Sequence, residues 1–361
     1  MSDVRYWIGL NRVPHIGPAR VAALLKFFGD LDAAWHANAT ALRAAGLPRD
    51  ALENLLYLRP KLDLDAEIER IKAQGIEILT WESEDYPRLL KDIDHPPPVL
   101  YVKGNLLPAD EFAMAIVGTR TPSSYGKEVA RRLASALAES GITVVSGMAL
   151  GIDGIAHKAA MDAGGRTVAV FGCGLDIVYP SRHRDLAQRI ARSGALISDY
   201  ALGTKPEAGN FPPRNRLISG LSLGTLVVEA GYKSGALITA RYALEQGRET
   251  FAIPGNIYNR TSTGTNGLLQ RGEAKLVTCV QDILEELNLA MIAQQKQVRE
   301  IVPDTPTEKA LLDCISMEPV HIDDLVRHSG LPTATVSSAL SMMELKGMVR
   351  RVENMRYVLV H

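Results

Sequence analysis

Positive side chains gather where strands are expected to end and helices to begin. The amino end of a helix carries a partial positive charge, so cations placed there are unfavourable unless an anion binds among them. The distances between these cations along the chain indicate that the anion is extended, as a chain of phosphates would be. The cations at or just after such junctions are Arg120, Lys205, Arg214, Arg216, Lys233 and Arg241.

The segment "NFPPRNRLISG" concentrates this chemistry. In a helix, Arg214 and Arg216 point to different sides, so one could contact phosphates while the other pairs internally. If the two prolines instead keep the segment extended, both arginines could face one groove. In either case Phe211 could stack beneath a base, which contributes about 1 to 3 kcal/mol per base without selecting a sequence. The alternative is purely structural, with Phe211 in the core and the arginines in surface ion pairs.

Three loops that contain glycine, "VGTRTPSSYG", "SGMALGIDGIAH" and "FGCGLDIVYP", follow strand-like runs. Glycine permits close backbone approach, and the helix that follows offers unpaired N–H groups, so each loop is suited to cradle a phosphate. The first loop is no Walker loop, because Thr121 replaces its first glycine and Glu128 stands where a hydroxyl should bind magnesium. In the second, Gly147, Gly151 and Gly154 are wrongly spaced for a dinucleotide site. We therefore expect no ATP hydrolysis, no NAD and no other cofactor.

Catalytic groups are sparse near these loops. Asp153 is expected to cap a helix, and His157 to be a partly buried packing or hydrogen-bonding residue. The enzymatic alternative is "LGTLVVEAG", in which Gly224, Thr225 and Glu229 are similar to the signature of the nucleotide phosphoribohydrolases. The carboxylate lies one residue too far along, and the preceding pair of glycines is missing. The chain is thus expected not to be an enzyme, and a nucleotide-cleaving enzyme built on Glu229 is the alternative.

The net charge of −1 conceals an uneven distribution of charge. Residues 114–260 contain 17 Lys and Arg against 11 Asp and Glu, whereas the whole chain has 40 against 41. The central part is therefore the basic part, as a polyanionic ligand requires.

Composition limits the class of protein. The 361 residues are 46 % apolar and 22 % charged, with no apolar run near the roughly 18 residues that a membrane span needs. The start, "MSDVRYWIGL", does not have the pattern of a secretory signal, so we expect a cytoplasmic protein that does not enter the membrane. Cys173, Cys279 and Cys314 are odd in number and far apart, which favours neither a disulfide framework nor a zinc site.

The pattern along the chain predicts two domains ahead of a linker. Residues 1–63 are expected to form a helical domain, in which "IGPARVAALL" is similar to a helix-hairpin-helix that contacts DNA or simply packs. Residues 64–288 alternate apolar strand-like runs with amphipathic helices, which predicts an extended Rossmann-like fold with a doubly wound parallel α/β sheet. Ligands of such sheets bind beyond the carboxyl ends of the strands, where the cations lie.

The C-terminal part is expected to be a small domain on a linker. Residues 289–306 are polar, contain prolines and are read as the linker, and residues 307–361 resemble a winged helix. Thr333 or Thr335 is expected to cap its recognition-type helix. That helix offers Thr, Ser and Met to base edges, which favours protein contact or packing over sequence-specific reading of a duplex. The charge lies in the expected two-stranded wing, at Arg350, Arg351 and Arg356.

These motifs occur together in one known family. "VGTRTPSSYG", "VVSGMALGIDGIAH", "GCGLDIVYP", "FPPRNRLISGLS", "VVEAGYKSGALITARYALEQGRETFAIPG" and "STGTNGLLQRGEAKLV" resemble, in order, the bacterial DNA-processing protein A (DprA/Smf) family. The resemblance extends over about Gly75 to Leu287, and the outer domains agree with it, since the family often has an N-terminal domain like a sterile-alpha-motif fold and a C-terminal winged helix. It implies a non-enzymatic homodimer that binds single-stranded DNA entering the cell in natural transformation, protects it, and loads the RecA recombinase in place of single-strand-binding protein.

The resemblance also implies a set of DNA-binding residues. Where relatives can carry a lysine three residues before the phenylalanine, this chain has Ala208, and we expect Lys205 to supply that charge. The residues that match the family's DNA-binding positions are Gly118, Thr119, Arg120, Ser146, Gly147, Phe211, Arg214, Asn215, Arg216, Lys233 and Ser234.

Overall fold

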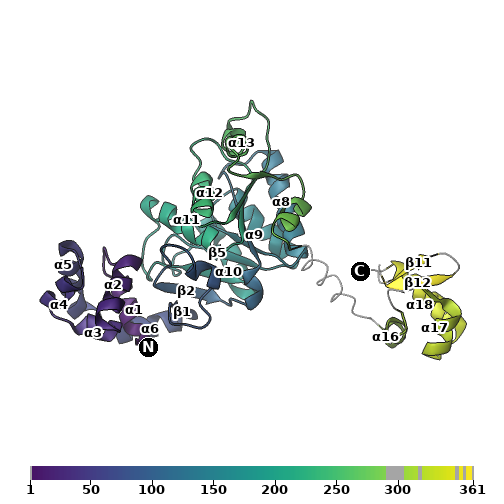
Figure 1. Cartoon of the computed structure of the whole chain (residues 1–361), viewed down its shortest axis with the longest axis horizontal. Coiled ribbons are helices and arrows are strands. Elements are labelled where there is room, and N and C mark those ends of the chain that lie inside the picture. The colour runs from purple at the N-terminus through teal and green to yellow at the C-terminus, as the bar shows by residue number, and fades with distance from the viewer. Residues whose placement is uncertain (1, 290–304, 316–318, 346–348, 353–354, 360–361) are drawn as a thin grey trace. The chain divides into compact units, whose positions relative to one another are not determined.

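The computed structural model describes residues 2–289, 305–315, 319–345, 349–352 and 355–359. The chain divides into two compact units, Met1–Asn288 and Leu289–His361 (Figure 1). The linker expected at 289–306 falls almost wholly outside the described residues.

A nine-stranded sheet forms the centre of the first unit, in the order β1-β2-β6-β5-β4-β3-β7-β8-β9. Strands β3 to β9 are parallel to one another, and β2 is antiparallel to both of its neighbours, β1 and β6. The strands are β1 (Ile76–Thr80), β2 (Val99–Gly104), β3 (Ala113–Val117), β4 (Thr143–Ser146), β5 (Thr167–Val170), β6 (Ala195–Ser198), β7 (Gly224–Val227), β8 (Glu249–Ala252) and β9 (Lys275–Leu276).

The predicted doubly wound α/β fold is confirmed, with β2 as the antiparallel exception. The first four residues of β2 are all buried, which is the pattern expected of a parallel strand, so burial alone does not reveal its direction. The reversal follows from the connection: the chain leaves β1 at Thr80 and returns to start β2 at Val99, which is the register partner of Thr80.

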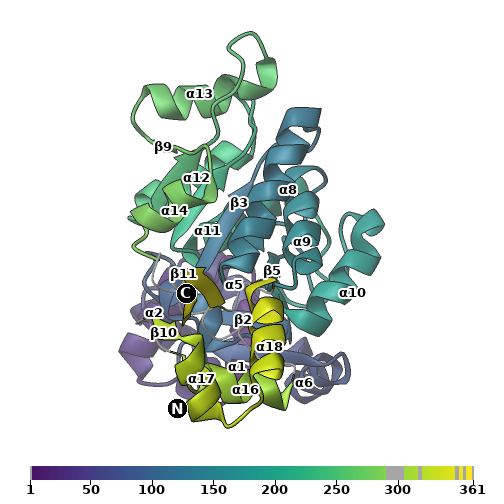
Figure 2. The ribbon, with the colours of Figure 1, turned by 90° about the vertical axis from the view of Figure 1, so that its right-hand side faces the viewer.

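Helices cover both faces of the sheet. Figure 2 shows α8, α9 and α10 on one side of β3 and α11 and α12 on the other. The second face also carries the short helix α7, and its core includes Leu217 and Ile218 from α11 packed on Val117 and Val227. The helices are α7 (Arg88–Lys91), α8 (Ser124–Glu139), α9 (Ile152–Asp162), α10 (Arg184–Ser193), α11 (Phe211–Gly220), α12 (Ala236–Glu245), α13 (Thr263–Gln270) and α14 (Val280–Glu286).

The strand order reverses between β3 and β7. From β3 the chain builds β4, β5 and β6 outward on one side, then crosses back to place β7, β8 and β9 on the other. The connections after β3 and β7 therefore diverge, and a crevice opens at the carboxyl ends of these two strands. This topological switch point is where an open α/β sheet binds its ligand.

The N-terminal helices pack on the edge of the sheet that carries β1 and β2. Trp7 and Leu10 belong to a core cluster that also contains Tyr101 of β2. The Tyr101 hydroxyl donates to Asn11 Oδ1 at 3.0 Å, and Asn11 Nδ2 donates to the Asp199 carbonyl at 3.2 Å. The helices are α1 (Val4–Asn11), α2 (Pro18–Phe28), α3 (Leu31–His36), α4 (Ala39–Ala44), α5 (Arg49–Leu58) and α6 (Leu64–Ala73).

The described residues of the second unit form three helices and a small antiparallel sheet ordered β10-β12-β11, around a core that includes Leu325 and Leu340. The expected capping by Thr333 or Thr335 is wrong: both lie inside the helix, and the amide of Thr335 donates to the Pro332 carbonyl. The elements are α16 (Pro306–Leu312), β10 (Val320–His321), α17 (Ile322–Ser329), α18 (Thr333–Leu345), β11 (Val349–Val352) and β12 (Arg356–Leu359).

Among the described residues, all three cysteines are free thiols and no group of His, Cys, Asp and Glu is arranged to hold a metal ion. The helices of the same residues include none long and apolar enough to cross a membrane.

Candidate nucleic-acid interface

A groove of about 840 Å³ lies at the switch point, between the loops that follow β3 and β7 and the start of α11. Eight of the twelve predicted DNA-binding residues line it, and four do not. The lining residues among them are Gly118, Thr119, Arg120, Phe211, Arg214, Asn215, Lys233 and Ser234.

The loop after β3 supplies an exposed cation. Its backbone is fixed from both sides, because the Thr119 amide donates to the Glu229 carbonyl at 2.7 Å and the Thr119 carbonyl accepts from the Ile152 amide at 3.2 Å. Arg120 then projects as an exposed side chain, with its guanidinium 6.0 Å from the centre of the Phe211 ring. Among the described residues no carboxylate forms an ion pair with Arg120, so its charge is available to a ligand.

A second exposed cation, Lys233, stands across the groove in the loop after β7. No ion pair reaches Lys233 from the residues that the structure describes. This loop is tied to α11, because Asn215 Nδ2 donates to the Gly235 carbonyl at 3.3 Å. Two free cations thus face one crevice from the two strands at which the order reverses.

Phe211 is half-buried and does not fill the core. Its ring packs on Gly172, where an added Cβ would come within 2.8 Å of ring carbon Cδ1. Tyr179 lies beside it, with ring centres 5.6 Å apart and planes inclined by 34°. Glycine at 172 lets one part of the ring settle against the backbone while the half-buried side chain still lines the groove, an arrangement suited to stacking under a base.

Arg214 lines the groove but is committed to the protein. It is 4 % exposed, and Nη1 donates to the carbonyls of Gly147, at 2.9 Å, and of Val170. Burial lowers the pKa of Arg214, and the nearby charge of Asp153 opposes that shift; the guanidinium stays protonated because arginine is so strongly basic. The side chain therefore ties α11 to the carboxyl ends of β4 and β5.

Asp153 is the counter-charge of Arg214. Its Oδ2 accepts the amides of Gly147, at 3.1 Å, and of Ala149, at 3.2 Å. The expected role as helix cap is wrong, because the cap position of α9 is Gly151 and Asp153 bonds to the preceding loop instead. Burial raises the pKa of Asp153, while Arg214 and the two amides favour the carboxylate.

Arg216 points away from the groove, as a helix requires of residues i and i+2. Its Nη2 donates to Asp199 Oδ2 at 2.7 Å and its Nη1 to the His95 carbonyl at 2.6 Å, and the side chain is 17 % exposed. The segment is helical from Phe211, with prolines in its first turn. The helical alternative for the two arginines is therefore the one that the chain adopts, and both of them pair internally.

Three further predicted residues lie outside the lining of the groove. Ser146 is fully buried, and its hydroxyl donates to the Ile116 carbonyl at 2.6 Å. Gly147 is held by two residues that do line the groove, because its carbonyl accepts from Arg214 and its amide donates to Asp153. Lys205 is exposed, and its neighbours Pro206 and Ala208 line the groove while Lys205 does not.

Sequence reasoning missed a second group of cations. A pocket of about 500 Å³ adjoins the groove through Arg120 and contains Lys127 from the first turn of α8, Lys158 from α9 and Arg182 from the turn after β5. All three side chains are exposed. Arg182 was open to prediction, because it lies two residues after "FGCGLDIVYP", and so was Lys127, which stands in the first turn of a helix. Lys158 lies in the interior of α9, away from the strand ends and helix starts where cations were sought.

The two candidate catalytic side chains are structural. Glu229 is 3 % exposed, and its Oε2 accepts the amide of Ser123 at 2.9 Å and the hydroxyl of Ser123 at 3.1 Å. This bond anchors the start of α8, so the carboxylate is not in the groove. His157 is fully buried rather than partly buried, and its Nδ1 lies 2.6 Å from Thr167 Oγ1. Burial lowers the pKa of His157 to about 3, so the ring is neutral.

Two family models match the chain. The family described as DNA recombination-mediator protein A matches residues 77–288, and the family described as DprA winged helix domain matches residues 295–355. The winged-helix interpretation of the C-terminal part is thereby confirmed.

Curated relatives match over nearly the whole chain. Protein Smf of Escherichia coli is 38 % identical over 368 residues, which cover 98 % of this chain and 95 % of the relative. Protein Smf of Synechocystis is 35 % identical over 393 residues, covering 99 % and 98 %. DNA processing protein DprA of Bacillus subtilis is 44 % identical over 217 residues, covering 60 % of this chain and 73 % of the relative.

Two solved structures of DNA processing protein A also superpose on this chain. The X-ray structure of DNA processing protein A from Streptococcus pneumoniae superposes with a TM-score of 0.69 at 33 % identity and covers 79 % of this chain and 99 % of its own. DNA processing protein A from Helicobacter pylori, a structure described for its single-stranded DNA binding mode, superposes with a TM-score of 0.54 at 34 % identity and covers 59 % and 95 %.

Proposed function

Because the chain belongs to the DNA recombination-mediator protein A family, we propose that it binds single-stranded DNA in the groove between β3 and β7. In this proposal it protects DNA that enters the cell during natural transformation and loads the RecA recombinase onto it. It acts in the cytoplasm as a homodimer, on strands that single-strand-binding protein would otherwise cover. The observation that carries the proposal is that Arg120 and Lys233, which have no ion pair among the described residues, line the same groove as Phe211.

The groove is chemically suited to an unpaired strand. Arg120 and Lys233 line the groove and would contact phosphates of the strand, which contributes affinity without reading the sequence. The partly exposed ring of Phe211 offers a stacking surface, and a base has a free face for it only when it is not stacked inside a duplex. The exposed cations Lys127, Lys158 and Arg182 continue the positive surface beyond Arg120 and would extend the bound strand past the groove.

Titration with oligo-dT and with a matching duplex at two salt concentrations tests the proposal. We expect tighter binding of the single strand at both concentrations, and an affinity that falls on single strands with a log–log slope of about −0.7 per phosphate contacted. Equal affinity for the duplex, or binding insensitive to salt, would contradict it.

We also propose that the groove binds DNA without cleaving it. Glu229, which the nucleotide phosphoribohydrolase alternative requires, uses its carboxylate to hold Ser123. Incubation with nucleoside monophosphates should therefore release no free base, measured by chromatography, from the wild type or from Glu229→Gln. Base release that disappears in Glu229→Gln would establish the enzymatic alternative instead.

Loading of the recombinase needs its own test, since DNA binding alone does not produce it. We expect the protein to accelerate RecA filament formation on single strands already covered by single-strand-binding protein. The control is naked DNA, on which the acceleration should be smaller. Strong DNA binding without any acceleration would leave the binding proposal intact and remove the loading role.

A further inference from the structure

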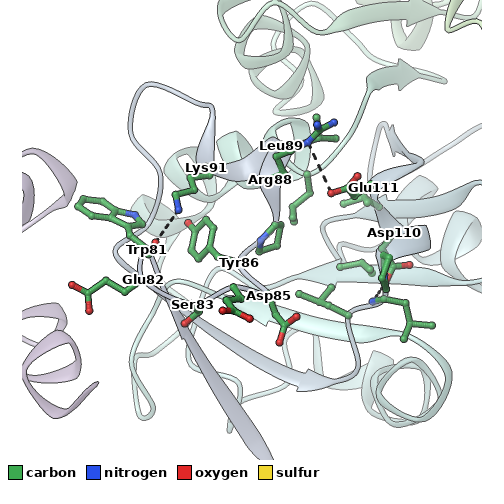
Figure 3. Close-up of a pocket in the computed structure, with 18 residues that line it drawn as sticks. Trp81, Glu82, Ser83, Asp85, Tyr86, Arg88, Leu89, Lys91, Asp110 and Glu111 are labelled. Carbon is green, nitrogen blue, oxygen red and sulfur yellow. Dashed lines mark hydrogen bonds and ion pairs between the residues drawn. The ribbon is translucent and has the colours of Figure 1, made fainter. Parts of the chain in front are cut away.

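A second large pocket, of about 630 Å³, lies on the same face of the sheet as α11 (Figure 3). Two segments form its walls: residues 81–91, which follow β1, and residues 106–111, which precede β3. Figure 3 shows Arg88 and Glu111 across the pocket from Ser83 and Asp85. None of the predicted DNA-binding residues lines it.

The floor of this pocket is apolar and belongs to the core of the sheet. Val145 of β4 and Val168 of β5 are register partners on neighbouring strands, so their side chains lie side by side on one face. Both belong to the buried cluster of that face, as do Leu221 and Tyr86. The floor side chains are almost fully buried, with Val145 1 % and Val168 2 % exposed, whereas Leu107 in the wall is 45 % exposed and gives an apolar side chain from outside a surface to pack on.

The rim of the pocket is acidic. Five carboxylates border it against two cations, and they are Glu82, Glu84, Asp85, Asp110 and Glu111 against Arg88 and Lys91. Asp110 is neutralised by Arg166 at 2.8 Å, and Lys91 is turned to the Trp81 carbonyl at 2.9 Å. Glu84 and Asp85 are exposed, and within the described part of the chain neither carboxylate has an ion pair or hydrogen bond. Their negative charge therefore stands open to a ligand.

The charge of the rim selects the kind of occupant. A polynucleotide would be repelled by Glu84 and Asp85, in contrast to the cationic groove. A protein segment whose apolar side chains are flanked by lysine or arginine would meet an apolar floor and a complementary rim at once. Apolar anchors in a desolvated pocket supply affinity, and flanking charges supply specificity and speed of encounter.

The pocket and the groove lie at opposite ends of the same strand. Glu111 shortly precedes the amino end of β3, and Gly118 follows its carboxyl end. A strand of this length spans about 17 Å at roughly 3.3 Å per residue. A peptide in the pocket therefore need not compete with DNA in the groove.

We propose that this pocket docks a segment of a partner protein that carries neighbouring apolar side chains flanked by lysine or arginine. Docking there would hold the partner on this protein while DNA occupies the groove between β3 and β7. The assignment rests on the shape and charge of the pocket alone and stands independently of the function proposed for the groove.

Selection of random short peptides displayed on phage, against the full chain saturated with oligo-dT, tests this. We expect the recovered peptides to combine paired apolar residues with lysine or arginine, and a labelled copy to bind the full chain in fluorescence anisotropy. The double variant Glu84→Lys/Asp85→Lys and the wall variant Leu107→Asp should each weaken that copy roughly tenfold or more. Addition of oligo-dT should leave the affinity of the peptide unchanged, because sites without coupling do not alter each other.

Matched variants keep the result interpretable. Glu69→Lys/Glu77→Lys reverses the same amount of charge at exposed positions outside the pocket and should leave peptide binding within about twofold. Retained oligo-dT affinity in every variant reports that the fold is intact. A selection that recovers no peptide sensitive to the pocket variants, peptides of acidic character, or peptides displaced by oligo-dT would overturn the proposal.

Discussion

The carboxylate of Asp153 and the guanidinium of Arg214 approach each other on either side of Gly147. A Cβ added to Gly147 would lie 2.8 Å from Arg214 Nη2 and 2.9 Å from Asp153 Oδ2, so a larger residue there would force these side chains to shift. Arg214 binds the Gly147 carbonyl and Asp153 binds its amide. The two charges thus hold one peptide of the loop after β4 from both sides, and with it the wall of the groove.

Replacement of Arg214 is expected to affect folding more than binding. Arg214→Met leaves Asp153 buried without a counter-charge and the carbonyls of Gly147 and Val170 unpaired. Each buried carbonyl left unpaired costs about 1 to 3 kcal/mol, which urea unfolding measures. A variant with unchanged stability and lost DNA binding would place Arg214 among the ligand contacts instead.

Replacement of Arg120 is expected to give the opposite pattern. Arg120 is exposed and unpaired among the described residues, so Arg120→Ala should change the free energy of unfolding by less than about 0.5 kcal/mol. Its affinity for unrelated single strands should fall about equally, and the salt slope should lose about 0.7 in magnitude for the missing phosphate contact. The control is Arg192→Ala. Arg192 lies in the last turn of α10, just before the amino end of β6 and away from the carboxyl ends that border the groove. Equal effects of the two substitutions would remove Arg120 from the interface.

Phe211 should act through its ring rather than its volume. Phe211→Ala is expected to weaken oligo-dT binding by about 1 to 3 kcal/mol, whereas Phe211→Trp should retain it, because either ring stacks on a base. Phe112→Ala removes an exposed ring just before the amino end of β3, away from the carboxyl ends that border the groove, and should have no effect. Titration with oligo-dT measures the affinity of each variant. An affinity of Phe211→Ala equal to that of the wild type would exclude stacking.

His157 makes the first unit sensitive to mild acid. The folded state keeps its ring neutral down to about pH 3, whereas the unfolded chain takes up the proton near the ordinary histidine pKa of about 6.5. The stabilisation is complete above pH 6.5 and is lost as the pH falls, at about 1.4 kcal/mol per pH unit once the unfolded histidine is protonated. The unfolding free energy of the wild type minus that of His157→Asn should show this slope between about pH 6 and 5. A difference that does not change with pH would contradict a neutral buried ring.

The strand ends of the interface could be predicted from the sequence, because a buried apolar run followed by glycine is a local pattern. Gly118, Arg120 and Lys233 were found in this way, and the fold brings them to one groove. The internal role of Arg214 could not be predicted from the sequence, because the carbonyls that it binds lie 67 and 44 residues away along the chain. Whether a cation meets solvent or a row of carbonyls depends on where distant strands end. The role of Ser146 could not be predicted either, because its hydroxyl donates to the carbonyl of Ile116 in the neighbouring strand β3.

Cations on helices were missed for a related reason. Lys127 and Lys158 occupy exposed positions of α8 and α9 that are typical of any solvated helix. Only the packing of these two helices against the turn that contains Arg182 gathers the charges around Arg120. The direction of β2 was hidden as well, because a strand buried on both faces has the same composition whichever way it runs.

The internal ties around the groove have a kinetic consequence. The loops that border it are held by contacts within the protein itself, through Arg214, Asp153 and the contact of Gly118 with Ile152. Capture of a strand therefore requires no prior rearrangement of the protein, and stopped-flow association should follow a single phase whose rate rises linearly with DNA concentration. Its speed is then set by how often the two molecules collide.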